Sequence, residues 1–170
     1  MYFAGIDIGS TMTKAVVIDE AENICGYVLG PSGAEHRRLA NWVMQEALNQ
    51  VGMDIDHVVY IVSTGYGRVN VPFADADLTE ITCHARGISK WVPQAHTIID
   101  IGGQDSKGIR IKAGRVTNFV MNDKCAAGTG RFLEIVAEIL GVKIEDLAEL
   151  SLQAKEKVNI SNICTAFAGQ

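Results

Sequence analysis

The sequence has no excess of basic residues. Its 15 Lys and Arg against 20 Asp and Glu give a net charge of −5, which excludes non-specific binding to nucleic acid phosphates. No apolar run approaches the ~20 residues that span a bilayer. The N-terminus also lacks the basic start and apolar stretch of a signal peptide. We therefore expect a cytoplasmic protein that contacts neither nucleic acid nor membrane.

Two common ligand-binding motifs are absent as well. The P-loop pattern Gly-x-x-x-x-Gly-Lys-Ser/Thr does not occur, so a nucleotide site would have to be of another kind. The four cysteines contain no Cys-x-x-Cys pair, which excludes zinc fingers and single-chain ferredoxin motifs. In a reducing compartment they are not expected to form a disulfide framework. The four histidines share no spacing, and we assign them no catalytic role.

Apolar periodicity predicts an α/β protein. Runs of apolar and β-branched residues predict strands at 2–8, 14–19, 24–29, 57–63, 97–102, 107–112 and 116–121. Three- and four-residue apolar spacing predicts helices at 35–51, 78–91, 130–140 and 144–150. A further short strand is expected at 158–160.

The order of these elements repeats, and the sequence repeats with it at an offset of 93 residues. Residues 7–9 (Asp-Ile-Gly) match residues 100–102, and Thr13 and Lys14 match Ser106 and Lys107. Such self-similarity indicates two related halves. We predict a first domain over residues 1–95 and the N-terminal part of a second, incomplete one over residues 96–170. Each domain places an Asp and a glycine turn at the tip of a β-hairpin.

The two predicted tips suit a nucleoside triphosphate with Mg²⁺. Asp7 and Asp100 are candidate Mg²⁺ ligands, mostly through water, because this cation prefers oxygen donors. Gln104 is a candidate for orienting the attacking water, and Lys14 for balancing phosphate charge. Glycines allow the backbone to approach phosphates closely. The candidate nucleotide-binding residues are Gly9, Ser10, Thr11, Thr13, Lys14, Gly102, Gly103, Gln104, Gly128, Thr129 and Gly130.

Cys125 lies three residues before a Gly-Thr-Gly turn (residues 128–130) that opens a predicted helix. The first N–H groups of a helix have no partner within the helix and attract anions. A phosphate and a thiolate-bound metal cluster are both candidates for that position. A buried cysteine beside an ordinary turn is the alternative interpretation.

These segments resemble known families. Residues 7–14 and 100–105 resemble the two phosphate motifs of the acetate kinase, sugar kinase, Hsp70 and actin superfamily. That resemblance implies an actin-like ATPase (ribonuclease H-like) fold with two related halves. Residues 64–68, 80–85 and 122–134, with 164–168, resemble more closely the ATPases that activate 2-hydroxyacyl-CoA dehydratases. These are proteins of the 2-hydroxyglutaryl-CoA dehydratase activator type, related to benzoyl-CoA reductase ATPase subunits.

The resemblance implies a homodimer with one [4Fe–4S] cluster, held by Cys125 and Cys164 of each chain. A cubane cluster needs four thiolates, and a two-fold axis would double the two that one chain offers. The implied function is ATP-gated electron transfer in an anaerobic cell. A ferredoxin or flavodoxin would reduce the cluster, and the electron would pass to a 2-hydroxyacyl-CoA dehydratase or a benzoyl-CoA reductase-like component. Cys25 and Cys83 are expected to be core or surface thiols.

Activators of this kind are expected to continue well past the second cysteine, so we expect a fragment or a shortened relative. Whether it binds ATP without the segment that grips the adenosine stays open. A small-molecule kinase of the same superfamily is one alternative and would use Asp75 or Asp77 as its base. Both acids also fit a solvated turn before a helix that starts at Thr79. A non-catalytic nucleotide-binding module is the other alternative.

Overall fold

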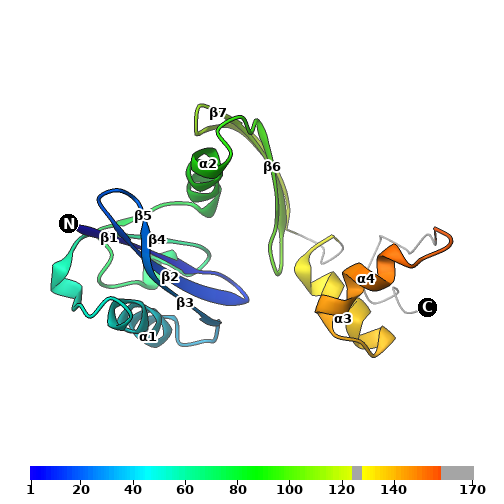
Figure 1. The fold of residues 1–170 in the computed structure, drawn as a ribbon, viewed down its shortest axis with the longest axis horizontal. Coiled ribbons are helices and arrows are strands. Elements are labelled where there is room, and N and C mark those ends of the chain that lie inside the picture. Colours follow the sequence, from blue (N-terminus) through cyan, green and yellow to red (C-terminus); the bar gives the residue numbers. More distant parts are fainter. Residues whose placement is uncertain (124–127, 158–170) are drawn as a thin grey trace. The chain divides into compact units, whose positions relative to one another are not determined.

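The computed structural model describes residues 1–123 and 128–157. The chain divides into two compact units (Figure 1). The first contains Met1–Pro93 and Ala113–Arg115, and the second Gln94–Lys112 and Val116–Gln170. The domain boundary between residues 95 and 96 stays a prediction.

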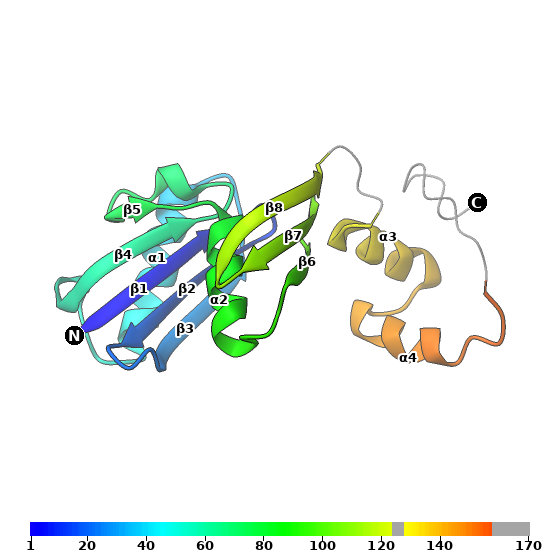
Figure 2. The same ribbon diagram turned by 90° about the horizontal axis from the view of Figure 1, so that it is seen from above.

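The first unit contains a five-stranded sheet with the order β3-β2-β1-β4-β5 (Figure 2). The strands are β1 (Tyr2–Ile8), β2 (Met12–Asp19), β3 (Ile24–Pro31), β4 (Val58–Thr64) and β5 (Ala76–Asp77). The first three pair antiparallel, whereas β4 pairs parallel with both β1 and β5. The four long strands confirm the sequence prediction. The two-residue strand β5 was not predicted, because it is too short to produce a pattern.

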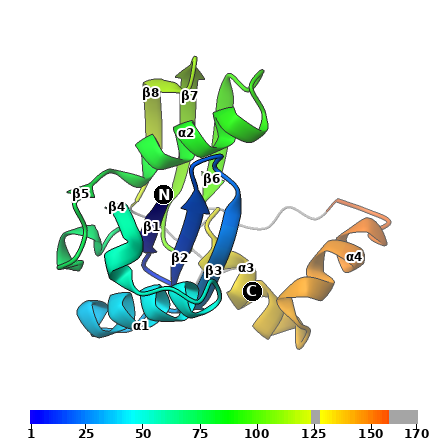
Figure 3. The same cartoon turned by 60° about the vertical axis from the view of Figure 1, so that its left-hand side comes forward.

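Helix α1 (His36–Asn49) packs on β2, β3 and β1 and covers one face of the sheet (Figure 3). Its buried residues recur at three- and four-residue steps, which places them on one face of the helix. They pack against alternate residues of the strands, including Ile6, Ile8 and Val17, which are at most 1% exposed. Burying such a side chain contributes about 1.5–3 kcal/mol. The core of the first unit thus lies between α1 and the strands that end at the first hairpin tip.

A second helix of the first unit, α2 (Glu80–Trp91), begins after Thr79. The Thr79 hydroxyl accepts a hydrogen bond from the Thr82 N–H, so the predicted helix start is confirmed. Two short 3-10 helices, η1 (Ile55–His57) and η2 (Arg68–Asn70), flank β4.

The second unit contains a three-stranded sheet with the order β6-β7-β8. Its strands are β6 (Thr97–Ile101), β7 (Ser106–Lys112) and β8 (Arg115–Asn122). Helix α3 (Gly130–Leu140) follows and ends at Gly141, whose φ of +67° is typical of a glycine stop. Then come η3 (Ile144–Asp146) and α4 (Leu147–Leu152). These elements confirm the predictions, whereas the strand expected at 158–160 lies outside the described residues. No helix in the described part of the chain is long and apolar enough to cross a membrane.

Candidate functional site

The first hairpin tip, between β1 and β2, brings a carboxylate and an ammonium group together. Asp7 and Lys14 are partners in the antiparallel register, and Lys14 Nζ lies 2.8 Å from Asp7 Oδ2. The Lys14 side chain is 43% exposed and that of Asp7 28%. Such a pair contributes little to stability because solvent screens it. Lys14 can therefore exchange its carboxylate partner for another anion at small cost.

The turn of this tip is held by Ser32, which follows β3. Ser32 Oγ donates to the Gly9 carbonyl at 2.6 Å and lies 2.9 Å from Thr13 Oγ1. The Ser32 N–H donates to the Thr11 carbonyl at 2.8 Å. Thr13 is fully buried, whereas Ser10 and Thr11 are exposed. Among these predicted nucleotide contacts, Ser10 and Thr11 are accessible, and the Thr13 hydroxyl faces another protein hydroxyl.

The loop after β4 (residues 65–67) lies against the Asp7 carboxylate. The Gly67 N–H donates to the Ile8 carbonyl at 2.9 Å, which ties the loop to the end of β1. Gly65 has a φ of +84°, and a Cβ there would lie 2.2 Å from Asp7 Oδ1 and 2.6 Å from the Ile8 carbonyl oxygen. Only glycine accommodates both the backbone angle and this close approach. The sequence predicted a loop here, and Gly65 and Gly67 were its only indication that the loop backbone approaches Asp7 and Ile8 closely.

The second hairpin tip repeats the register of the first. Asp100 pairs with Lys107 as Asp7 pairs with Lys14, which confirms the 93-residue offset in three dimensions. The two lysines differ in burial, because the Lys107 side chain is only 3% exposed. Its Nζ lies 2.6 Å from Asp105 Oδ1 and 3.7 Å from Asp100 Oδ2. Lys107 therefore holds two carboxylates in place, whereas Lys14 remains available to solvent.

The start of α3 is bonded directly to the second tip. The Gly130 N–H donates to the Gly102 carbonyl at 2.8 Å, and the Arg131 N–H donates to the Gly103 carbonyl at 3.2 Å. Ser106 Oγ donates to the Gly128 carbonyl at 2.5 Å. The sequence predicted bare N–H groups for an anion here. That prediction is wrong for these two donors, because the backbone of the second hairpin already occupies them.

The remaining candidates of the second unit differ in accessibility. Gln104 is exposed at the tip, and Thr129 is 1% exposed. Cys125 and Cys164 both lie outside the described residues. Within the described ranges, no group of three or more His, Cys, Asp and Glu side chains could hold a metal ion. Cys25 and Cys83 are free thiols of intermediate exposure, as expected.

The two acids nominated for kinase chemistry have structural partners. Asp75 Oδ2 accepts a hydrogen bond from the Ile61 N–H at 2.7 Å. Asp77 lies in β5 and pairs with Arg68, whose Nε lies 3.3 Å from Asp77 Oδ2. The sequence interpretation of a solvated turn is therefore incomplete, since this segment adds a strand to the sheet. Both carboxylates therefore have protein partners, whereas the base of a kinase would need a carboxylate without one.

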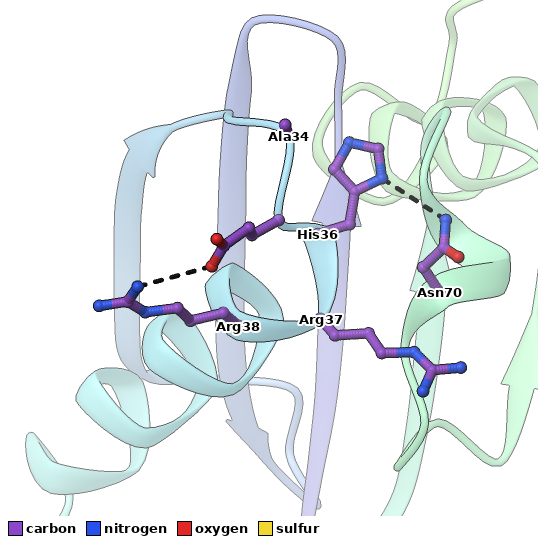
Figure 4. A pocket seen from close by; sticks show the side chains of 6 residues that line it. Ala34, His36, Arg37, Arg38 and Asn70 are labelled. Atoms are coloured by element: carbon purple, nitrogen blue, oxygen red, sulfur yellow. Dashed lines mark hydrogen bonds and ion pairs between the residues drawn. The ribbon is translucent and has the colours of Figure 1, made fainter.

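A separate hollow of about 470 Å³ lies at the start of α1 (Figure 4). Its lining residues include His36, which pairs with Asn70, and Arg38, which pairs with Glu35. Arg37 also lines it. The hollow is cationic but contains none of the residues predicted to bind nucleotide.

Comparison with known proteins identifies the family. The model of the BadF/BadG/BcrA/BcrD ATPase family matches residues 4–170. The chain belongs to this family. The (R)-2-hydroxyglutaryl-CoA dehydratase activating ATPase of Acidaminococcus fermentans is 44% identical, over 99% of this chain and 65% of that protein. The 2-hydroxyisocaproyl-CoA dehydratase activator of Clostridioides difficile is 42% identical, over 99% of this chain and 63% of the relative. The chain thus spans slightly less than two thirds of these relatives.

Solved structures agree with this assignment. The A. fermentans (R)-2-hydroxyglutaryl-CoA dehydratase component A superposes with a TM-score of 0.92 at 44% identity, over 99% of this chain and 65% of that one. The C. difficile activator with bound ADPNP gives a TM-score of 0.91 at 42% identity, over 99% and 63% of the chains. The family member has the predicted actin-like ATPase fold.

The residues of the first unit fit the phosphates and Mg²⁺ of ATP. Asp7 supplies carboxylate oxygens, Lys14 supplies an ammonium group, and the backbone at Gly65 leaves no room for a Cβ beside the carboxylate. In addition, Thr64 Oγ1 is buried without a hydrogen-bond partner in the described part of the chain. Buried polar atoms normally have a partner, so such an atom calls for an explanation. The donor set is the one that a hydrated Mg²⁺ and phosphate oxygens require.

Proposed function

We propose that this chain is the phosphate-binding part of an ATP-dependent activator of a 2-hydroxyacyl-CoA dehydratase. ATP hydrolysis is coupled to the donation of one electron through a [4Fe–4S] cluster that bridges a homodimer. The observation that carries the proposal is the repeated Asp–Lys pair, at equivalent register positions of two hairpins 93 residues apart. Membership of an ATPase family and similarity to dehydratase activators support it.

The two hairpin tips have different roles in binding and hydrolysing ATP. Asp7 and Asp100 would hold Mg²⁺, which would offset the phosphate charge, and Lys14 would exchange Asp7 for a phosphate oxygen. Lys107 instead fixes Asp100 and needs no exchange, because it is buried. The exposed Gln104 orients the attacking water. The glycine backbone of each turn contacts the phosphates, with the exposed Ser10 and Thr11 in the first turn, whereas the buried Thr13 supports that turn through Ser32.

The cluster supplies a one-electron carrier when bound. Cys125 and Cys164 of one chain and the same two of its partner provide the four thiolates. A reduced ferredoxin or flavodoxin would provide the electron, and the dehydratase, or a benzoyl-CoA reductase-like component, would receive it. The chain's own role is to hold the cluster and to present it when ATP is bound.

The second hairpin provides a short connection between nucleotide and cluster. Two backbone hydrogen bonds and the Ser106 hydroxyl join its tip to residues 128–131. Cys125 precedes Gly128 by three positions in the sequence. A change at the tip on hydrolysis would thus be passed to the segment that carries the cysteine. This coupling needs no long relay.

Anaerobic purification of the full-length protein tests the proposal. We expect a brown dimer with four irons per dimer that bleaches with dithionite, and Cys125→Ala or Cys164→Ala should abolish the colour. Asp7→Asn and Asp100→Asn should retain the colour and stop ATP hydrolysis. A colourless, iron-free monomer after cluster reconstitution would refute the activator function. Phosphorylation of a small molecule would favour the kinase alternative, and nucleotide binding without hydrolysis the non-catalytic module.

A further inference from the structure

Thr64, the last residue of β4, carries the one buried side-chain oxygen or nitrogen atom without a hydrogen-bond partner in the described ranges 1–123 and 128–157. Its neighbour Ser63, which is on the opposite face of β4, has hydrogen-bond partners. Ser63 Oγ donates to the Arg68 carbonyl at 3.0 Å. Of these two neighbouring hydroxyl groups, only that of Thr64 therefore lacks a hydrogen-bond partner.

Strand register places Thr64 in the candidate nucleotide site. Lys14 on β2 is the partner of Asp7 on β1, and Asp7 is in turn the partner of Thr64 on β4. Residues in register on neighbouring strands project from the same face of a sheet. Lys14, Asp7 and Thr64 thus form one row across three strands. The sequence does not reveal this row, because β4 follows β1 by about fifty residues and pairs with it in parallel.

The carboxylate in the middle of the row has a close neighbour at each of its oxygens. Asp7 Oδ2 faces Lys14 at 2.8 Å, and Asp7 Oδ1 lies against the backbone of Gly65. The Thr64 hydroxyl is therefore adjacent to the carboxylate in the sheet without being bonded to it. It is a neutral group that both donates and accepts hydrogen bonds, on the strand next to the Asp7 carboxylate, with the Lys14 ammonium on the other side of that carboxylate.

From this arrangement we propose that Thr64 is a further nucleotide-binding residue, whose hydroxyl donates a hydrogen bond to a phosphate oxygen of Mg²⁺–ATP. The inference rests on the proposed function. A hydroxyl adds a donor to the row without adding charge, so it complements Lys14 without competing for Asp7. The position retains its hydroxyl at a cost to the ligand-free protein, since the group gains its partner only when nucleotide binds.

This role predicts effects of opposite sign on stability and on binding. Thr64→Val removes the unpaired hydroxyl and keeps the shape and strand preference of the side chain. The ligand-free midpoint of thermal unfolding should therefore rise. Affinity for Mg²⁺–ADPNP should fall about tenfold, the effect of one hydrogen bond to a charged group. Thr64→Ser keeps the hydroxyl and should bind within about twofold of the wild type.

Ser63→Ala is the matched control. It removes a hydroxyl that has a partner, so the ligand-free midpoint should fall because the Arg68 carbonyl loses a donor. The shift of the midpoint with Mg²⁺–ADPNP should stay as in the wild type. A structural role for Thr64 would give the same pattern as this control. Thr64→Val is instead expected to raise the ligand-free midpoint and to reduce its shift with Mg²⁺–ADPNP.

The experiment measures thermal unfolding of the full-length wild type and the three variants, with and without Mg²⁺–ADPNP. A raised ligand-free midpoint with a reduced ligand shift in Thr64→Val supports the proposal. If Mg²⁺–ADPNP shifts the midpoint of that variant as much as that of the wild type, or if its ligand-free midpoint is lowered, the role of Thr64 is refuted but the proposed nucleotide function is not. No ligand shift in the wild type overturns the proposed nucleotide function, and the role of Thr64 with it.

Discussion

Gly65→Ala is the change that tests most sharply how the first hairpin tip is positioned. A Cβ at residue 65 would lie 2.2 Å from Asp7 Oδ1, whereas ordinary van der Waals contact begins at 3.4 Å. The carboxylate oxygen must therefore move by about 1.2 Å, the difference of these two distances. Rotation of the Asp7 side chain cannot relieve the whole clash. The same Cβ lies 2.6 Å from the carbonyl oxygen of Ile8, which belongs to the backbone of β1.

The size of the effect follows from this displacement. A shift of about 1 Å in a catalytic group can reduce turnover about 100-fold. A non-glycine residue in the left-handed region also costs about 1–2 kcal/mol of stability. We therefore expect Gly65→Ala to lose about 100-fold in ATP turnover and to need more Mg²⁺ for half-maximal rate. The second effect follows because Asp7 is the proposed Mg²⁺ ligand.

Gly52→Ala separates the clash from the backbone strain. Gly52 has a φ of +65°, but no atom lies within 4 Å of a Cβ built there. It should lose about 1–2 kcal/mol of unfolding free energy with turnover unchanged. The assay is steady-state ATP hydrolysis as a function of Mg²⁺ concentration, together with urea unfolding. If Gly65→Ala hydrolyses ATP with the same rate and Mg²⁺ requirement as Gly52→Ala, the loop does not position Asp7.

Three further predictions follow from the contacts of the two hairpins. Lys107→Met should lose about 3 kcal/mol of unfolding free energy in urea, because it leaves Asp100 and Asp105 without their buried counter-charge. Lys14→Met should change the free energy of unfolding by less than about 1 kcal/mol and should instead weaken Mg²⁺–ATP binding in a titration. Equal stability losses in the two variants would contradict a structural role for Lys107 and a ligand-binding role for Lys14. Ser32→Ala should cost about 2 kcal/mol in the same unfolding assay, since the Gly9 carbonyl loses its donor, and an unchanged midpoint would refute this.

Much of the local structure could be predicted because the signals are local. Runs of apolar and β-branched residues predicted the strand positions, and three- and four-residue apolar spacing predicted the residues of α3. The 93-residue repeat predicted the equivalent positions of Asp7 and Asp100, which the strand registers confirm. Each of these features depends on residues within one hairpin or one helix.

The features that were missed depend on contacts between distant segments. The repeat predicted equivalent positions for Lys14 and Lys107 but not their different surroundings. Asp105 has no counterpart in the first half, where Met12 stands, and Lys107 is buried. The approach of Gly65 to Asp7 follows from the parallel pairing of β1 with β4, which no local pattern encodes. The N–H donors of α3 were predicted to be available because the sequence does not show that the second hairpin folds onto them.

The most direct test of the account is equilibrium binding of Mg²⁺–ADPNP to the full-length protein by titration calorimetry. The wild type, Asp7→Asn and Asp100→Asn are compared, each checked for folding by circular dichroism. The account predicts that the wild type binds one nucleotide per chain. Each variant should bind at least about tenfold more weakly, since each loses a carboxylate that we propose as a Mg²⁺ ligand. Binding of equal strength in all three proteins would contradict the claim that the paired hairpins form the nucleotide site.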